Sequence, residues 1–230
     1  MGITLSSRFC KFSERPDLWW CRRTQIIPRR VSSFGEAPPA DACTHLSRDI
    51  AQDSNSDLVK GYSFVGLTQN LENPISDIAS IPATYRWKPD NQTEYKGNVV
   101  FDFMTSDTRG DSTSSSAQEL MLWLRYEGGQ IPIGYNEGPV ATINNLYGRT
   151  WKLYQGLNTD TGITFSSLLV DPDDQFHGWF KGDIKDWLLA MVDQGLFTAS
   201  TYVNVGNAGM EPFYGNVTFE NKVGVHINLA

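Results

Sequence analysis

The sequence predicts an all-β fold in which two antiparallel sheets pack as a sandwich with one helix against them. From about residue 59, short apolar runs alternate with polar residues and are separated by turn residues, a rhythm typical of antiparallel sandwiches. The chain has 230 residues, within the range of a single large all-β domain. Hydrophobic residues make up 40% of it, which is sufficient for a substantial core.

The composition narrows the class of partner. The formal net charge is -7, which argues against nucleic acid or an anionic membrane surface, because phosphate binding relies on clustered Lys and Arg. No stretch approaches the ~18 consecutive apolar residues of a membrane helix. The chain is rich in Trp (7), Tyr (9) and Phe (12), and aromatic faces suit sugar rings, although most of these side chains are expected in an ordinary β core. The sequence therefore favours a neutral ligand.

The first 58 residues differ from the rest, and we predict an atypical, poorly specified N-terminal segment over 1–58. It is locally basic and keeps no alternation for six residues; only 17–20 and 41–46 resemble pieces of strand. Its start, Met1 to Arg8, lacks the apolar region of a secretory signal. All three cysteines lie here, and one disulfide with one free thiol is the simplest arrangement. Residues 59–230 are predicted to form the folded domain.

Within 59–230 the predicted elements follow one another with clear turn signals. The segments 108–116 and 127–138 are predicted loops, because they are rich in Gly and polar residues. A helix is predicted over about 180–194, where Phe180, Ile184 and Trp187 recur at helical spacing and Gly195 follows as a cap. Strands are predicted at 62–67, 82–87, 98–104, 118–126, 140–143, 150–154, 161–170, 202–205 and 217–229.

The strand 118–126 is the centre of the functional hypothesis, because its two faces differ in character. With a period of two, one face takes the apolar residues Leu120, Leu122, Leu124 and Tyr126 and is expected to join the core. The other face takes Glu119, Met121, Trp123 and Arg125, a combination suited to the floor of a groove. In 98–104 the same alternation sends Val99, Phe101 and Phe103 to one side and Asp102 to the other.

A second carboxylate, Glu211, lies between Gly206 and Gly215 and before Pro212, so we expect it at a sheet edge or a bulge beside an opening. Hydrolysis of a glycosidic bond needs one carboxylic acid to protonate the leaving oxygen and a second carboxylate across the sugar. Glu119 and Glu211 are candidates for this pair, although a Glu on an exposed strand usually has no catalytic role. The three histidines are scattered without ligand spacing, so no metal site is predicted.

Five segments in order resemble glycoside hydrolase family 12, the endoglucanases and xyloglucanases with a β-jelly-roll fold. They are Val59–Ser63, Ile78–Pro82, Phe101–Thr105, Glu119–Leu124 followed by Pro132–Gly134, and Gly209–Phe213. The match covers 59–230, so this part is identified as the family's jelly-roll domain.

The resemblance implies a retaining endo-β-1,4-glucanase that acts on cellulose, mixed-linkage glucan or xyloglucan. It implies Glu119 as nucleophile, Glu211 as acid/base and Asp102 as the carboxylate that hydrogen-bonds the nucleophile. The substrate-binding residues that it implies are Met121, Trp123, Pro132 and Phe213. It implies no cofactor and no metal, a monomer that binds β-glucan and meets a proteinaceous glucanase inhibitor, and secretion to the extracellular space.

The N-terminal segment departs from the family pattern. Family members carry an Asn-Asn-Leu-Trp-Gly strand and a Trp-x-x-x-Trp-x-Trp segment, whereas this chain has only Asp17-Leu18-Trp19-Trp20 and nothing equivalent between Ser47 and Val59. The alternative hypothesis is therefore a catalytically impaired relative that binds glucan or an inhibitor protein without turnover; a wrong start or mis-spliced exon is a further explanation. The resemblance also implies a Cys10–Cys43 bridge, with Cys21 as the competing partner.

Overall fold

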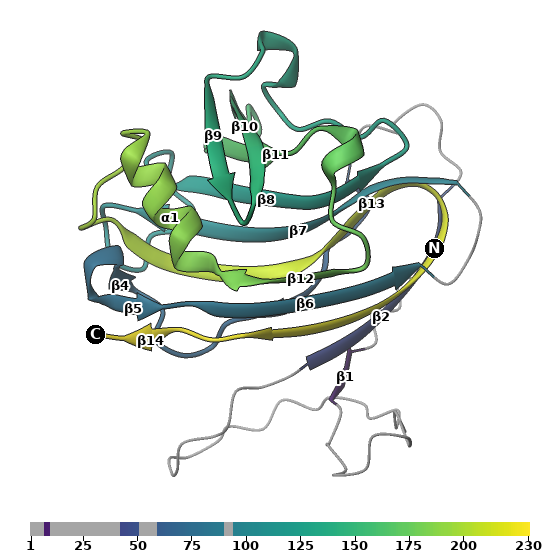
Figure 1. Ribbon diagram of the computed structural model, residues 1–230, viewed down its shortest axis with the longest axis horizontal. Coiled ribbons are helices and arrows are strands. Elements are labelled where there is room, and N and C mark those ends of the chain that lie inside the picture. The colour runs from purple at the N-terminus through teal and green to yellow at the C-terminus, as the bar shows by residue number, and fades with distance from the viewer. Residues whose placement is uncertain (1–6, 10–41, 51–58, 90–93) are drawn as a thin grey trace.

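The computed structural model describes residues 7–9, 42–50, 59–89 and 94–230 (Figure 1). It is built almost entirely of strands, with one α-helix, α1 (Ile184–Asp193), and short 3-10 turns at Ile75–Asp77, Tyr135–Glu137 and Pro172–Asp174. The strands are β1 (Ser7–Phe9), β2 (Ala42–Ile50), β3 (Ser63–Gly66), β4 (Asn73–Pro74), β5 (Ile78–Ser80), β6 (Pro82–Pro89), β7 (Tyr95–Ser106), β8 (Gln118–Glu127), β9 (Ala141–Leu146), β10 (Arg149–Leu157), β11 (Thr164–Leu169), β12 (Trp179–Asp183), β13 (Tyr202–Val225) and β14 (Asn228–Leu229).

The strand β13 connects the two layers of the sandwich. Its first half pairs with β7, and β8, β11, β10 and β9 continue that layer in this order. Its second half pairs with β2 and β6, and β12 continues the other layer beyond β6. Within the described ranges, every strand pair is antiparallel except β8 with β11, which is parallel. The predicted all-β jelly-roll sandwich with one packed helix is confirmed.

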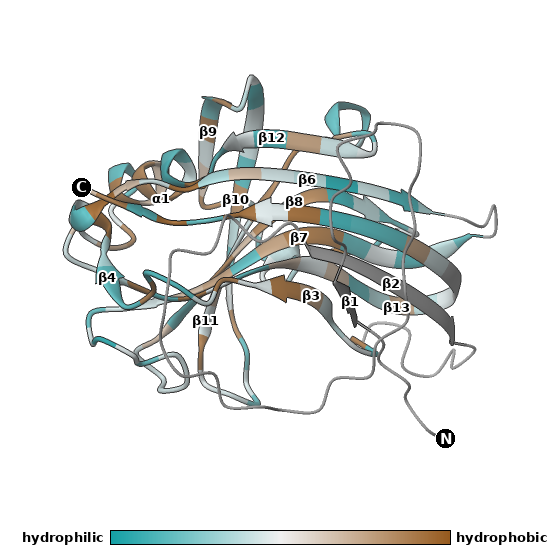
Figure 2. Ribbon diagram, turned by 90° about the horizontal axis from the view of Figure 1, so that it is seen from below, coloured by the Kyte–Doolittle hydropathy of each residue, from teal (hydrophilic) through white to brown (hydrophobic). Residues whose placement is uncertain are grey.

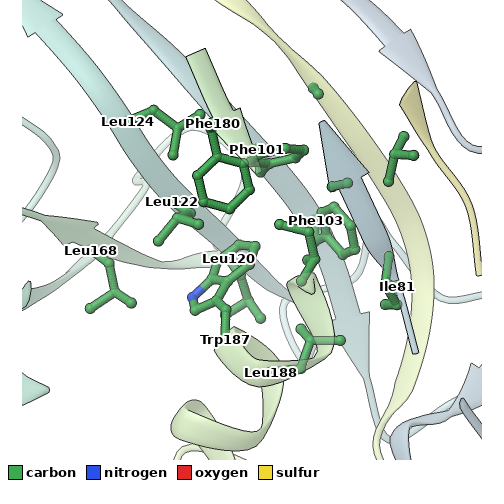
Figure 3. Packing of buried hydrophobic residues seen from close by; sticks show 14 of the residues in the cluster. Ile81, Phe101, Phe103, Leu120, Leu122, Leu124, Leu168, Phe180, Trp187 and Leu188 are labelled. Atoms are coloured by element: carbon green, nitrogen blue, oxygen red, sulfur yellow. The ribbon is translucent and has the colours of Figure 1, made fainter. Parts of the chain in front are cut away.

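The main core lies between the layers and under α1 (Figure 3). The ring of Phe101 on β7 packs edge-on against Phe180 of β12, with 5.4 Å between the ring centroids. Phe103 packs in the same way against Trp187 of α1 at 5.6 Å. The predicted core side of β8 joins them, since Leu120, Leu122 and Leu124 are fully buried in this cluster.

The helix begins later than the sequence predicts, so the expected start at 180 is wrong. Residues 179–183 form β12, and Phe180 lies opposite Tyr85 of β6. The carboxylate of Asp183 then accepts hydrogen bonds from the backbone amides of Ile81 (2.6 Å) and Lys185 (3.0 Å), which caps the helix at its first turn. Phe180 still reaches the core, but from a strand.

The expectation that Glu211 lies at a sheet edge is wrong, because β13 has neighbours on both sides there. Met210 pairs with Val99 of β7 and with Ser63 of β3. Gly209 permits this close approach: a Cβ at that position would lie 2.4 Å from the carbonyl oxygen of Ser63. The predicted bulge is present, since the register with β7 shifts between Pro212 and Tyr214.

The N-terminal segment contributes two described strands beside the domain, β1 and β2, which pair with each other. Strand β2 pairs with residues 215–223 of β13, and the domain boundary at 58 stays a prediction. Residues 17–20, Cys10 and Cys21 lie outside the described residues, and Cys43 is described only as part of the β2 backbone. In the described part of the chain, no helix has the length and apolar character needed to cross a bilayer.

Candidate active site

The layer of β7, β8 and β11 carries a second hydrophobic cluster on the face turned away from the core. We call this side the outer face. The cluster consists of Val100, Met121, Trp123, Tyr154 and Leu169, with Tyr62, Tyr126 and Phe165 packed against it. Figure 2 shows both hydrophobic and hydrophilic stretches along β7 and β8, whose successive side chains point to the core and to the outer face in turn. This separation agrees with the predicted alternation for Met121 and Trp123.

Three adjacent strands bring three carboxyl groups to the outer face. Asp102 of β7 lies opposite Met121 of β8, and Glu119 lies two positions before Met121 on the same side. Glu211 of β13 lies opposite Asn98 of β7, while its neighbour Met210 points into the core. The three carboxyl groups of the sequence-based hypothesis are therefore on one face, although 92 positions separate Glu119 from Glu211 in the chain.

Burial raises the pKa values of all three groups, and repulsion between carboxylates raises those of Glu119 and Asp102 further. For Glu119, burial and then the charges of Asp102 and Glu211 raise the pKa to about 9. For Asp102, burial and then Glu211 raise the pKa to about 7. Burial also raises the pKa of Glu211, opposed by a hydrogen bond from Asn98. Near neutral pH these groups therefore share protons, and the set can both donate and accept a proton.

Asn98 is a site residue that sequence reasoning missed. Its side chain is 1% exposed, and its Nδ2 donates to Oε2 of Glu211 at 2.7 Å. The backbone amide of Glu211 donates in return to Oδ1 of Asn98 at 3.2 Å. Only the cross-strand register reveals this pair, since nothing in the local sequence of β7 singles out one Asn.

Tyr62 is a second residue that sequence reasoning missed. Its ring packs over Gly209, where a Cβ would lie 2.7 Å from the tyrosine Cε2. Its hydroxyl is buried and has no hydrogen-bond partner among the residues that the structure describes. Burial and then the charges of Asp102 and Glu211 raise its pKa well above the usual value. The tyrosine occurs in the segment Val59–Ser63 used for the family resemblance, which was the available signal.

Unpartnered polar atoms gather on the outer face. Among the described residues, nine buried side-chain polar atoms lack a partner, and four belong to Tyr62, Asp102, Trp123 and Ser167. Ser167 of β11 lies opposite Met121, on the same face. Buried polar atoms are normally hydrogen-bonded, so this concentration indicates a surface that meets a polar ligand. The hydroxyl groups of a sugar both donate and accept hydrogen bonds, so a sugar is a ligand of this kind.

Two exposed aromatic rings flank the cluster. Phe64 is 48% exposed and stacks on Tyr62 at 5.0 Å, and Tyr135 is 40% exposed and stacks on Tyr154 at 4.8 Å. Neither ring was among the residues predicted to bind substrate. Tyr135 belongs to the predicted loop after β8, whose contact with β10 is not readable from the sequence.

The four predicted substrate-binding residues differ in where they lie relative to the carboxyl groups. Met121 and Trp123, at 4% and 2% exposed, are part of the outer-face cluster. Phe213 is 7% exposed at the bulge of β13 and belongs to neither hydrophobic cluster. Pro132 is buried in the loop that carries Tyr135 onto Tyr154, and its carbonyl accepts a hydrogen bond from the backbone amide of Tyr135.

A bulge at Leu124 corrects two expectations for β8. Val99 pairs with Arg125 and Val100 with Trp123, so Leu124 is an extra residue without a counterpart. Past a bulge the alternation reverses. Tyr126 therefore packs beside Trp123 on the outer face, not in the core. Arg125 therefore does not line the groove; its Nε donates a hydrogen bond to Glu127 and its Nη1 contacts His177.

In the described part of the chain, no three His, Cys, Asp or Glu side chains converge on a metal-sized site.

Comparison with known proteins gives one family. The model described as glycosyl hydrolase family 12 matches residues 32–224. Endoglucanase A of Aspergillus kawachii is 34% identical over 161 residues, which cover 68% of this chain and 63% of that protein. Xyloglucan-specific endo-beta-1,4-glucanase A of Aspergillus niger is 33% identical over 159 residues, which cover 69% and 61%. The chain thus spans less than two thirds of the length of these curated relatives.

Two solved structures share the fold. The crystal structure of Trichoderma harzianum endoglucanase 3 superposes with a TM-score of 0.70 at 26% identity, covering 82% of this chain and 79% of that one. The catalytic domain of Humicola grisea Cel12A, in complex with a soaked thio cellotetraose, superposes with a TM-score of 0.64 at 26% identity, covering 82% and 86%. The jelly-roll architecture is therefore that of a known group of enzymes.

Proposed function

This chain belongs to glycosyl hydrolase family 12, and from that premise we propose that it is a retaining endo-β-1,4-glucanase acting on cellulose, mixed-linkage glucan or xyloglucan. The observation that carries the proposal is the set of three carboxyl groups on one face of adjacent strands, Asp102, Glu119 and Glu211. Their raised pKa values supply a proton near neutral pH, as an acid catalyst requires.

In the proposed first step, the carboxylate of Glu119 attacks the anomeric carbon while Glu211 gives its proton to the leaving glycosidic oxygen. A covalent glycosyl–enzyme and a shortened glucan chain result. In the second step, Glu211 takes a proton from water, and the water oxygen displaces Glu119 at the anomeric carbon. Two displacements at one carbon return the original β configuration.

We assign Asp102 to the support of Glu119. The nucleophile has to be ionised, whereas burial and the neighbouring charges favour its protonated form. With a pKa of about 7, Asp102 is protonated over most of the acidic range, and a protonated carboxyl can donate a hydrogen bond. Its Oδ1 is buried and has no partner within the described chain. A hydrogen bond from protonated Asp102 to Glu119 stabilises the ionised nucleophile and gives Oδ1 of Asp102 a partner.

The exposed rings of Phe64 and Tyr135 are proposed to stack on glucosyl units on either side of the reacting bond. The proposal of β-glucan as substrate also rests on the relatives, which are named endoglucanase and xyloglucan-specific endo-beta-1,4-glucanase. We further propose an extracellular monomer that meets a proteinaceous glucanase inhibitor, as family resemblance implies. Sedimentation of the purified chain at one mass across concentrations supports the monomer, and a concentration-dependent mass contradicts it.

The direct test is hydrolysis of carboxymethylcellulose and xyloglucan by the purified chain. We expect a rapid fall in viscosity with release of reducing ends, and ¹H NMR of early products that shows the β-anomer first. Appearance of the α-anomer first would contradict the retaining mechanism. No reducing ends from either polymer would contradict the enzyme assignment.

The second candidate is a glucan- or inhibitor-binding relative without turnover. The observation that favours it is the absence of the tryptophan-rich segment between Ser47 and Val59, because remote binding contributes to catalysis. Retention of the chain on insoluble glucan or inhibitor, without product release under conditions in which a family enzyme is active, supports this candidate. Normal turnover excludes it.

A further inference from the structure

The cross-strand pair of Asn98 and Glu211 fixes the orientation of the Asn98 amide. Oδ1 accepts a hydrogen bond from the backbone amide of Glu211, so the other end of the side chain is the donor. That donor, Nδ2, lies 2.7 Å from Oε2 of Glu211. Both bonds join residues directly opposite each other on β7 and β13, and Asn98 is almost completely buried. The amide therefore has one arrangement.

The two oxygens of Glu211 are consequently not equivalent. A primary amide does not give up its proton near neutral pH, so Oε2 always faces a donor and is the poorer place for an acid proton. The proton of neutral Glu211 is directed to Oε1. When Glu211 becomes a carboxylate, the same donor stabilises the charge, because hydrogen bonds to ionised acceptors are the stronger ones.

Resting on the proposed function, we propose that Asn98 is a positioning residue that directs the transferable proton of Glu211 to Oε1 and stabilises the carboxylate left after transfer. During the first step, the Oε1–H bond breaks as an O–H bond forms at the leaving oxygen, and the negative charge passes to Glu211. During the second step, Oε1 takes a proton from the attacking water. Asn98 keeps its own protons throughout.

Other ionisable groups lie on the strands and loops around Glu211. Asp102 on β7, Glu119 on β8 and Tyr62 before β3 all interact electrostatically with Glu211. Two lysines come from the flanking elements: Lys96 is two residues before Asn98, and the backbone amide of Lys60 bonds to Pro212. Burial raises the pKa of Glu211, and the Asn98 bond lowers it. Loss of this bond is therefore expected to raise the pKa of Glu211.

The test compares Asn98→Leu and Asn98→Asp with Asn221→Leu and Asn221→Asp. Asn221 is a matched control because it is a buried asparagine of the same strand as Glu211, and it accepts a hydrogen bond from Tyr85 in the main core. With cello-oligosaccharides, kcat/KM of Asn98→Leu is expected to fall by about 10- to 100-fold, the equivalent of one charge-assisted hydrogen bond. The Asn221 variants are expected to change it by less than about threefold per folded molecule.

A substrate whose leaving group needs no proton distinguishes loss of the positioning role of Asn98 from general damage to the fold. With 2,4-dinitrophenyl β-cellobioside, the leaving group departs as a stable phenolate, so kcat/KM reports a first step without acid assistance. We expect Asn98→Leu to keep this rate within about threefold of the wild type. Equal loss on both substrates would overturn the proposal, because it is the result expected from a distorted site.

The pH profile gives a readout that a structural role does not move. A carboxyl group at position 98 can donate to Oε2 only when protonated, so Asn98→Asp is expected to regain activity as the pH falls, with its optimum about one unit or more below that of the wild type. Asn98→Leu has no such recovery. An unchanged optimum in Asn98→Asp would overturn the proposal.

Titration of Glu211 by ¹³C NMR distinguishes failure of this inference from failure of the proposed function, because it requires no turnover. We expect a higher pKa of Glu211 in Asn98→Leu than in the wild type, and no change in Asn221→Leu. If the wild type hydrolyses no glucan but this shift is present, only the proposed function fails. If the wild type is active and the shift is absent, the inference about Asn98 fails.

Discussion

The two faces of β8 differ in what their residues contribute. On the core face, Leu120 and Leu122 are fully buried among aliphatic and aromatic side chains. On the outer face, the intervening positions carry Glu119 and Met121, next to half-buried carboxyl groups and unpartnered polar atoms. The first arrangement stabilises a fold, whereas the second lowers stability and is typical of a functional site. Three predictions test this contrast.

The largest expected effect is on activity at the outer face. Glu119→Gln and Glu211→Gln are each expected to lower kcat/KM on glucan by about a thousandfold or more, since each removes a reacting carboxyl group without changing its size. Glu220→Gln is the control, because Glu220 is an exposed carboxylate of the same strand as Glu211. Reducing-sugar assays with equal amounts of folded protein measure the effect. Activity that survives either active-site substitution would refute the assignment.

The next prediction compares substitutions at two adjacent residues of β8, Leu122 and Met121. Leu122→Ala leaves a cavity in the main core and is expected to lower the free energy of unfolding by about 2–5 kcal/mol, with kcat/KM of the folded protein nearly unchanged. Met121→Ala is expected to raise KM for glucan, because Met121 lies on the outer face with Trp123. Urea unfolding and steady-state kinetics on both variants provide the measurement. If Leu122→Ala reduced kcat/KM as much as Met121→Ala, the two faces would not be functionally distinct.

The smallest effect is the pH dependence of stability. The pKa of Asp102 is raised from 3.8 to about 7 and that of Glu119 from 4.5 to about 9. Between the unfolded and folded values the unfolded chain binds fewer protons, so the stability from these groups is greatest below about pH 4 and falls as the pH rises from about 4 to about 7 for Asp102 and to about 9 for Glu119. We expect the Tm of the wild type to fall over this range and that of Asp102→Asn to fall less. Equal slopes in calorimetry would contradict the predicted burial of charge.

Strand alternation was sufficient to predict much of this site. It assigns Phe101 and Leu122 to the core and Asp102 and Glu119 to the opposite side, because a period of two is a local property of the chain. The bulge at Leu124 depends on pairing with β7, so the sequence did not indicate that Arg125 and Tyr126 exchange sides.

Other features depend on partners distant in the chain. Phe180 has helical spacing to Ile184, yet it lies on strand β12 and reaches the same core from there. The helix starts only after Asp183, whose carboxylate caps its first turn. The roles of Asn98 and Tyr62 arise from their position beside Glu211 across two strands, for which a single strand has no signal.

The most direct measurement of the central claim is covalent trapping of the nucleophile. A 2,4-dinitrophenyl 2-deoxy-2-fluoro-β-cellobioside reacts in the first step, and its fluorine slows the second, because it destabilises the oxocarbenium-like transition state. Mass spectrometry of the peptides then locates the sugar. We predict one fluorosugar per molecule, attached to Glu119. Attachment to Glu211 or Asp102, or no attachment to a protein that hydrolyses glucan, would contradict the account.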